Sequence, residues 1–364
     1  MTLLFFALGC GTQPMEVDVA YGGGQGDSDG DVDEPAASDH DCVPASPGSY
    51  ERAHPEHMFG ALVFQMDPDA QTFQSIDDMV DMGMNTASLR FFIPFDENGA
   101  LRYPYTVQGQ EFVSLDHQLC FMGNLLHDFK QAGLSIILSG EPHFYDKYAW
   151  MELYPDWDVT NGIPGVKTLG DEAAETFEAE ALFVMEGLAE LSEKYQVEVV
   201  SPISEADRFF EIDQCSSFMQ DSRVSFQGYG GKLLWQIYGE ALLEPTGSSG
   251  DGRVDMTGYD IAGLSIIGCD METPPWDRYI DGIVGWAEED GVPEVAISEM
   301  GCVFIPESVE DAEANFSYWV EKTSEYSTGL ILLDTPQSSE EKQGVLGTWV
   351  EEWAREYAEE LGLL

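Results

Sequence analysis

Short apolar segments recur along this chain and alternate with segments of helical periodicity. Their β-branched composition is typical of parallel strands covered on both faces. These segments lie at 60–65, 86–93, 134–139, 197–207, 231–238, 261–268, 291–302 and 329–333. Helical periodicity separates most of them and is clearest in 171–194, although no clear helix joins the fifth segment to the sixth. The alternation predicts an α/β fold of the (β/α)8 barrel type, also called a TIM barrel.

The chain is long enough for one such barrel. It has 364 residues, of which 43% are hydrophobic, and a single barrel typically needs about 250 residues. We therefore expect residues 51–364 to form one catalytic-size domain.

The first 50 residues have a different composition. An apolar run at 3–8 is too short to span a bilayer and stops at Gly9-Cys10-Gly11. This resembles the lipobox of exported lipoproteins, although no basic residue precedes the run and Leu8 is not small; a chance cysteine is the alternative. We expect a signal at 1–10 with lipidation of Cys10, then a disordered acidic linker at 11–50. The protein would then be extracytoplasmic, either secreted or held at the membrane only through its lipid anchor.

The charge of the chain is extremely negative. It has 68 acidic and 15 basic residues, for a formal net charge of −53. Nine of the acids lie in the first 50 residues, so most of the acidity belongs to the predicted domain. Such a surface repels nucleic acid and anionic lipid headgroups and favours a neutral substrate. A high-salt habitat would suit it, because dissolved ions screen the self-repulsion.

Two of the predicted strands end in glutamates. Glu205 follows the apolar run that begins at Val197, and Glu299 follows a similar run that includes Val295 and Ile297. The carboxyl ends of barrel strands form the active-site face in this fold. Retaining hydrolysis of a glycosidic bond needs two carboxyl groups about 5–5.5 Å apart, one protonated and one ionised. The two glutamates are therefore candidate catalytic residues.

Further residues carry a family resemblance over roughly residues 58–335. The segment MNTASLRFFIPF places Arg90 near the end of the second strand, and EPHFYD places His143 after the third. Together with the two glutamates, this pattern resembles clan A retaining glycoside hydrolases, which include family 5 cellulases and mannanases and family 53 galactanases. The resemblance implies that Glu205 is the acid/base and Glu299 the nucleophile. It also implies that Arg90 steadies the nucleophile and that His143 lines a sugar subsite.

Other substrate-binding positions are less clear. Ser204 stands where the family usually has an asparagine that binds the sugar 2-OH, and the sixth strand around Ser265 has no aromatic residue or histidine. Trp235 is a candidate stacking platform, as are Trp150 and Trp157, since aromatic rings suit the apolar faces of sugars; packing in the core is the alternative for each. The long segment 94–113 is a candidate binding loop.

No cofactor or metal ion is predicted. The cysteines show no CxxC spacing, and acids such as Asp67 and Asp69 lack the spacing of an EF-hand. Apart from Cys10, five cysteines remain, so one stays unpaired. Cys269 and Cys302 follow neighbouring strands and are the candidate disulfide.

The sequence therefore predicts a retaining glycoside hydrolase that acts by double displacement on a neutral poly- or oligosaccharide, with carbohydrate as its binding partner. One alternative is a catalytically diverged carbohydrate-binding barrel lipoprotein. Another is a solute-binding lipoprotein, which would have two lobes and a hinge.

Overall fold

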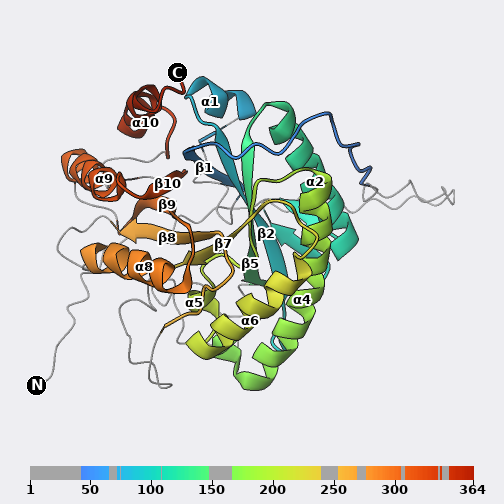
Figure 1. Cartoon of the computed structure of the whole chain (residues 1–364). Coiled ribbons are helices and arrows are strands. Elements are labelled where there is room, and N and C mark those ends of the chain that lie inside the picture. The colour runs from blue at the N-terminus through green and yellow to red at the C-terminus, as the bar shows by residue number, and fades with distance from the viewer. Residues whose placement is uncertain are drawn as a thin grey trace, which may run out of the picture. The chain divides into compact units, whose positions relative to one another are not determined.

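Eight parallel strands form a closed barrel (Figure 1). The computed structural model describes residues 42–64, 72–73, 75–107, 109–146, 166–238, 253–268, 276–304, 308–334, 337 and 344–364. Each barrel strand pairs with the next barrel strand along the chain, and the last pairs with the first. The strands are β1 (Met58–Phe64), β2 (Thr86–Phe95), β5 (Ser135–Phe144), β6 (Val199–Ser201), β7 (Lys232–Ile237), β8 (Ile261–Gly268), β9 (Glu294–Phe304) and β10 (Ser327–Leu333). The predicted (β/α)8 barrel is confirmed, and two lobes joined by a hinge are not found among these residues.

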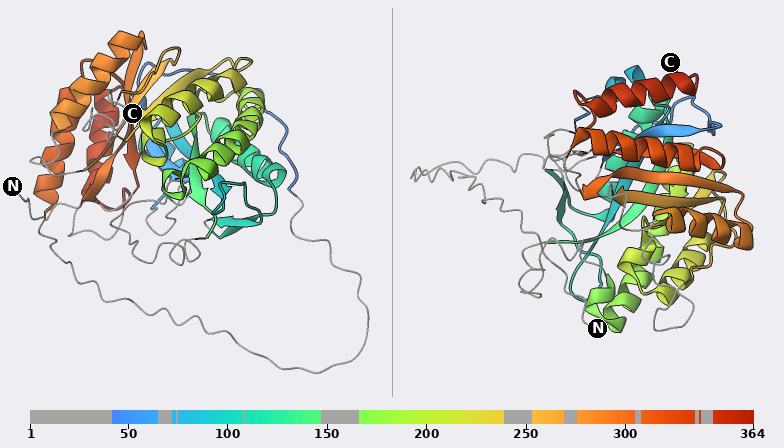
Figure 2. Two further views of the ribbon diagram at one scale, coloured as in Figure 1. Left: turned by 90° about the horizontal axis from the view of Figure 1, so that it is seen from below. Right: turned by 90° about the vertical axis from the view of Figure 1, so that its left-hand side faces the viewer.

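Helices surround the barrel, with α2 and α4 on one side and α8 and α9 on the opposite side (Figures 1 and 2). They are α1 (Ile76–Asp81), α2 (Leu115–Gln131), α4 (Asp171–Lys194), α5 (Ala206–Phe209), α6 (Ile212–Ser225), α8 (Trp276–Asp290), α9 (Val309–Thr323) and α10 (Trp349–Glu360). The segment between β2 and α2 contains a small antiparallel hairpin of β3 (Tyr105–Val107) and β4 (Gln110–Phe112). None of the described helices is both long and apolar enough to cross a membrane.

Alternate residues of each strand face opposite layers of the core, as the strand period of two requires. One set fills the barrel interior and forms a small apolar cluster: Met58, Leu62, Ile137, Val199, Leu234, Ile261, Ala296, Ile331 and Leu333. The other set packs outward against the helices in a much larger cluster. Polar residues that follow the inward set toward the carboxyl ends therefore face the barrel mouth.

The segment that precedes β1 packs against the barrel. A disulfide joins Cys42 to Cys120 of α2, with their Cα atoms 6.1 Å apart, and the Tyr195 hydroxyl donates to the carbonyl of Ala45 at 2.8 Å. Composition assigns residues 42–50 to the disordered linker, but here they are attached to the folded body. The reason is tertiary, because the disulfide and these hydrogen bonds join residues far apart in the sequence.

The disulfide predicted from the sequence, between Cys269 and Cys302, is a different pair from Cys42 and Cys120. Cys269 and the side chain of Cys302 lie outside the described residues, so that pairing stays a prediction. Cys215 is buried and unpaired.

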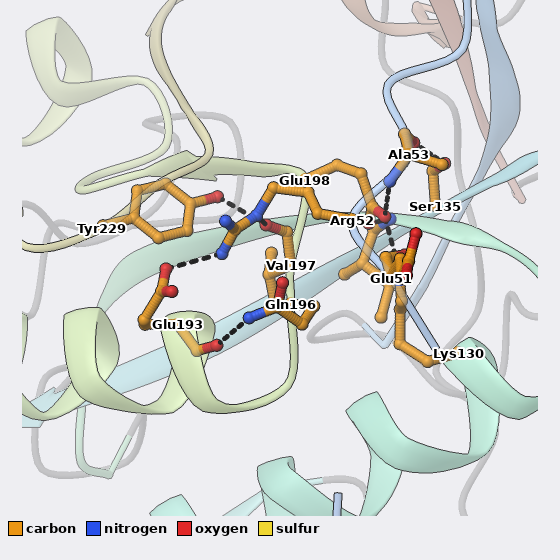
Figure 3. A network of polar contacts seen from close by, with 11 residues as sticks. Glu51, Arg52, Ala53, Lys130, Ser135, Glu193, Gln196, Val197, Glu198 and Tyr229 are labelled. Carbon is orange, nitrogen blue, oxygen red and sulfur yellow. Dashed lines mark hydrogen bonds and ion pairs between the residues drawn. The ribbon is translucent and has the colours of Figure 1, made fainter. Parts of the chain in front are cut away.

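A polar network closes the amino end of the barrel (Figure 3). Glu198, fully buried just before β6, forms an ion pair with Lys130 and accepts hydrogen bonds from the backbone N–H groups of Ala53 at 3.1 Å and Ile136 at 2.8 Å. Arg52 donates to the Val197 carbonyl at 2.7 Å and pairs with Glu193. The segment around Arg52 thus caps the end of the barrel opposite to Glu205.

The Glu198–Lys130 pair is expected to stabilise the fold through its complete burial. Glu198→Gln would leave Lys130 as a buried charge without a carboxylate, so we expect a loss of about 3 kcal/mol in the free energy of unfolding. Urea denaturation followed by circular dichroism measures this loss.

Glu294→Gln is the matched control. Glu294 pairs with Lys232 at 2.5 Å at the same end of the barrel, but the two side chains are 25% and 29% exposed. The control is expected to cost less than about 1 kcal/mol, because solvent screens such a pair. Equal losses in the two variants would contradict a special role for the buried pair.

Candidate active site

A β-bulge turns Glu299 into the barrel. Ile297 of β9 pairs with Leu264, whereas Glu299 pairs with the next residue of β8, Ser265, so β9 contains one extra residue there. Ile297 and Met300 both belong to the outer core cluster, which leaves Ser298 and Glu299 together between two outward positions. Bulges commonly re-aim a side chain next to an active site.

The Glu299 carboxylate is held by two donors. Its Oε1 accepts a hydrogen bond from Gln236 Nε2 at 2.8 Å and forms an ion pair with Nη2 of Arg90. Gln236 comes from β7 and is itself fixed by a hydrogen bond to Ser265 Oγ at 3.0 Å. Glu299 is only 7% exposed, and such charge-assisted contacts stabilise the ionised form of its carboxyl group.

Arg90 lies at the centre of the site and is 1% exposed. Besides Glu299, its Nε pairs with Glu141 Oε2 of β5 at 3.1 Å, and its Nη1 donates to Ser88 Oγ at 3.4 Å. Burial lowers the pKa of the Arg90 guanidinium, while the negative charges of Glu141 and Glu205 raise it. The surrounding carboxylates therefore keep a fully buried cation in place.

Glu205 follows β6 in a left-handed backbone conformation, with φ 51°. Residues other than glycine rarely adopt it, and such strain is often found at functional sites. The conformation is held by a hydrogen bond from Ser204 N to the Gly140 carbonyl at 2.7 Å and by one from Arg208 N to the Glu205 carbonyl at 2.8 Å.

The two carboxyl oxygens of Glu205 have different surroundings. Oε2 pairs with Arg208 Nη1 at 2.9 Å, and the guanidinium of Arg208 lies over the ring of Tyr238, 4.7 Å from its centroid. Oε1 is buried and has no hydrogen-bond partner among the described residues. One oxygen is therefore fixed, and the other is available to a bound molecule.

His143 lies two residues beyond Glu141 on the same face of β5. Its Nδ1 is 2.9 Å from the hydroxyl of Tyr105, which belongs to the hairpin in the candidate binding loop. Burial lowers the pKa of His143 to about 4. Burial, followed by the charge of Glu141, raises the pKa of Tyr105 well above its usual value. Both rings are thus neutral near pH 7, and a hydrogen bond joins the Tyr105 hydroxyl to Nδ1 of His143.

The other site residues predicted from the sequence have different surroundings from one another. Ser204 is buried beside Glu205. Trp235 is fully buried on the outward face of β7, with its ring 5.0 Å from that of Tyr259. This corrects the prediction of Trp235 as a stacking platform, because strand alternation gives the inward position to Gln236. Cys10, Trp150 and Trp157 lie outside the described residues.

Three polar side chains of the site were not singled out in the sequence: Glu141, Gln236 and Arg208. The positions of two of them within their strands could have identified them from the sequence. Gln236 is polar within the apolar run of β7 and lies two residues after the inward Leu234, and Glu141 lies four residues after the inward Ile137. Because side chains alternate with a period of two, counting from these inward residues toward the carboxyl end of each strand places both side chains inside the barrel.

Comparison with known proteins adds evidence on the fold. No protein-family model and no curated protein sequence matches the chain. Among solved structures, it is similar to a GH113 β-1,4-mannanase, with a TM-score of 0.54 at 16% identity over 83% of this chain and 98% of that one. A GH113 β-mannanase from Alicyclobacillus acidocaldarius gives 0.53 at 14% identity, covering 84% and 97%. An endo-1,4-β-D-mannanase from Thermotoga petrophila gives 0.52 at 12%, covering 83% and 99%.

The chain shares the barrel fold of these mannanases. The likeness spans nearly all of each mannanase, so no large part of their fold is missing here. At these low identities the likeness establishes the architecture alone.

The arrangement places two carboxyl groups in different surroundings. Glu299 is held by a guanidinium and an amide, which favour its ionised form. Glu205 also pairs with a guanidinium through Oε2, but its Oε1 is buried without a hydrogen-bond partner among the described residues and can contact a bound molecule. Among the described residues, no group of three or more His, Cys, Asp or Glu side chains is placed to hold a metal ion.

The low pKa of His143 gives a prediction. Its ring should remain neutral at pH 5.5 and titrate near pH 4, because burial penalises the charged imidazolium. Nitrogen-15 NMR of the imidazole, with the signal identified by its loss in His143→Gln, measures the midpoint. Titration near pH 6.5, the value of an unperturbed histidine, would contradict it.

Proposed function

We propose that this protein is a retaining glycoside hydrolase that cleaves a neutral poly- or oligosaccharide, with Glu299 as nucleophile and Glu205 as acid/base. The observation that carries the proposal is the contrast between the two glutamates. Glu299 is locked between Arg90 and Gln236, whereas Glu205 Oε1 is buried without a partner among the described residues. The likeness to mannanases makes β-linked mannans the first substrates to test.

In the proposed first step, a carboxylate oxygen of Glu299 attacks the anomeric carbon. The bond to the leaving oxygen breaks, and that oxygen takes the proton from Glu205. Because Arg208 occupies Oε2, the proton resides on Oε1. In the second step Glu205, now ionised, removes a proton from water, which attacks the glycosyl-enzyme and releases Glu299.

The ion pair of Glu205 with Arg208 has a role in this cycle. It stabilises the carboxylate that forms after proton transfer, and it holds the side chain in one orientation. His143 is within the same mouth of the barrel and, being neutral, can form a hydrogen bond with a sugar hydroxyl through Nε2 while Nδ1 is bonded to Tyr105.

The acidic composition supports an uncharged substrate. With a net charge of −53, the protein repels polyanions such as nucleic acids and acidic polysaccharides. A neutral chain of sugars approaches such a surface without electrostatic cost.

Substitution of each of the two glutamates is predicted to reduce activity in a different way. Glu299→Gln removes the attacking carboxylate and should lower kcat on every substrate by several orders of magnitude. Glu205→Gln removes the proton donor and should impair substrates with poor leaving groups far more than activated aryl glycosides, which depart without a proton. Steady-state kinetics on both kinds of substrate measure this difference.

Chemical rescue adds a second readout. Azide should partly restore Glu205→Ala, giving a glycosyl azide of retained configuration, because azide attacks the intermediate without a general base. A product of inverted configuration would contradict the proposal, as would equal losses on both kinds of substrate. Absence of turnover in the native protein on aryl glycosides, β-glucans, mannans and galactans would favour the diverged carbohydrate-binding barrel instead.

We also propose export with a lipid on Cys10. The disulfide between Cys42 and Cys120 supports an oxidising compartment, where such bonds persist. Cys10→Ala should move the expressed protein from the detergent phase to the aqueous phase in a Triton X-114 partition, because the lipid is its proposed anchor. Unchanged partitioning would argue against lipidation.

A further inference from the structure

A third carboxylate lies inside the candidate active site. Glu141 of β5 is 9% exposed, and its Oε2 is 3.1 Å from Arg90 Nε. The site therefore contains three carboxyl groups, Glu141, Glu205 and Glu299, and two guanidiniums. The two-glutamate mechanism leaves Glu141 without a role.

Backbone contacts bring Glu141 close to Glu205. The residue before Glu141, Gly140, accepts a hydrogen bond from Ser204 N, which directly precedes Glu205. The approach is so close that a Cβ on Gly140 would lie 2.2 Å from the Pro202 carbonyl oxygen. The titratable and charged groups that face Glu141 are Arg90 from β2, Glu205 from the end of β6, Arg208 from α5 and Tyr105 from β3.

We propose that Glu141 is a positioning residue for the reaction: it orients the Arg90 guanidinium toward Glu299, and its negative charge keeps the proton on Glu205. This inference rests on the proposed function of the two glutamates. It assigns each of the three carboxylates a separate task.

The orienting task follows from the shape of arginine. A guanidinium is a planar fork with donors in fixed directions. Glu141 occupies the Nε edge while Nη2 faces Glu299, so the two contacts together fix the plane. Without Glu141, Arg90 would keep the ion pair with Glu299 but could rotate within it.

The electrostatic task follows from the distribution of charge. The pKa of Glu141 is raised above its usual value, mainly by burial; the charge of Arg90 lowers it, that of Glu205 raises it and that of Arg208 lowers it. The interaction with Glu205 is reciprocal, so an ionised Glu141 opposes loss of the proton from Glu205. It also balances part of the charge of Arg90, which would otherwise draw that proton away.

Two substitutions at Glu141 separate these tasks. Glu141→Gln removes the charge but keeps an oxygen that accepts from Arg90 Nε. Its plateau kcat should stay within about threefold of the native value, while the alkaline limb of kcat/KM moves to lower pH by about 0.5 to 1 unit. Glu141→Ala loses both tasks, so the same shift should come with at least a tenfold lower plateau kcat, roughly the cost of a misplaced catalytic group.

Glu294→Gln is the matched control, because it removes an ion-paired glutamate of β9 at the other end of the barrel. It should leave the pH profile and the plateau unchanged. An unmoved alkaline limb in Glu141→Gln would overturn the inference. So would a native plateau kcat in Glu141→Ala, or the same shift in Glu294→Gln.

A titration that needs no turnover tests the inference separately. Carbon-13 NMR of protein labelled at the glutamate carboxyl groups follows Glu205 directly, with its signal identified by its loss in Glu205→Gln. Its midpoint should fall in Glu141→Gln, and an unchanged midpoint would overturn the inference. A native protein without turnover would instead overturn the proposed function, and the titration would still decide the effect of Glu141.

Discussion

The buried charge of Arg90 is the constraint on which the site depends. A guanidinium that is 1% exposed is tolerated only where carboxylates and hydrogen-bond acceptors surround it. Glu141 and Glu299 meet this need from two different strands, and Ser88 supplies a further acceptor. The same contacts hold Glu299 in place, so burial of one cation organises the carboxylates around it.

The two ends of the barrel use buried ion pairs for different purposes. At the amino end, Lys130 and Glu198 form a pair whose remaining hydrogen bonds are satisfied by backbone groups, and the segment before β1 covers it. At the carboxyl end, Glu205 has an oxygen without a partner among the described residues and a left-handed backbone. Satisfied polar groups stabilise a fold, whereas unsatisfied or strained ones indicate a place where a ligand completes the structure.

The candidate site was partly predictable. Glu205, Arg90 and His143 follow or end strands that the apolar runs define, and strand ends meet at one face of a barrel. Trp235 was a candidate stacking platform, and the structure shows the alternative, packing in the core, since hydrophobic composition alone does not show which residues of β7 point inward. Arg208 gave no signal, because its pairing with Glu205 depends on the short helix α5 that follows the left-handed residue.

The sequence by itself determined the alternation of strands and helices, because each apolar run is a local pattern that burial imposes on its own residues. It also determined which chemical groups stand near the strand ends. Only the tertiary structure decided how they meet: the bulge that turns Glu299 inward, the sharing of Arg90 between Glu141 and Glu299, and the bond between Cys42 and Cys120. These features depend on register and contact between segments far apart in the chain, which no local pattern encodes.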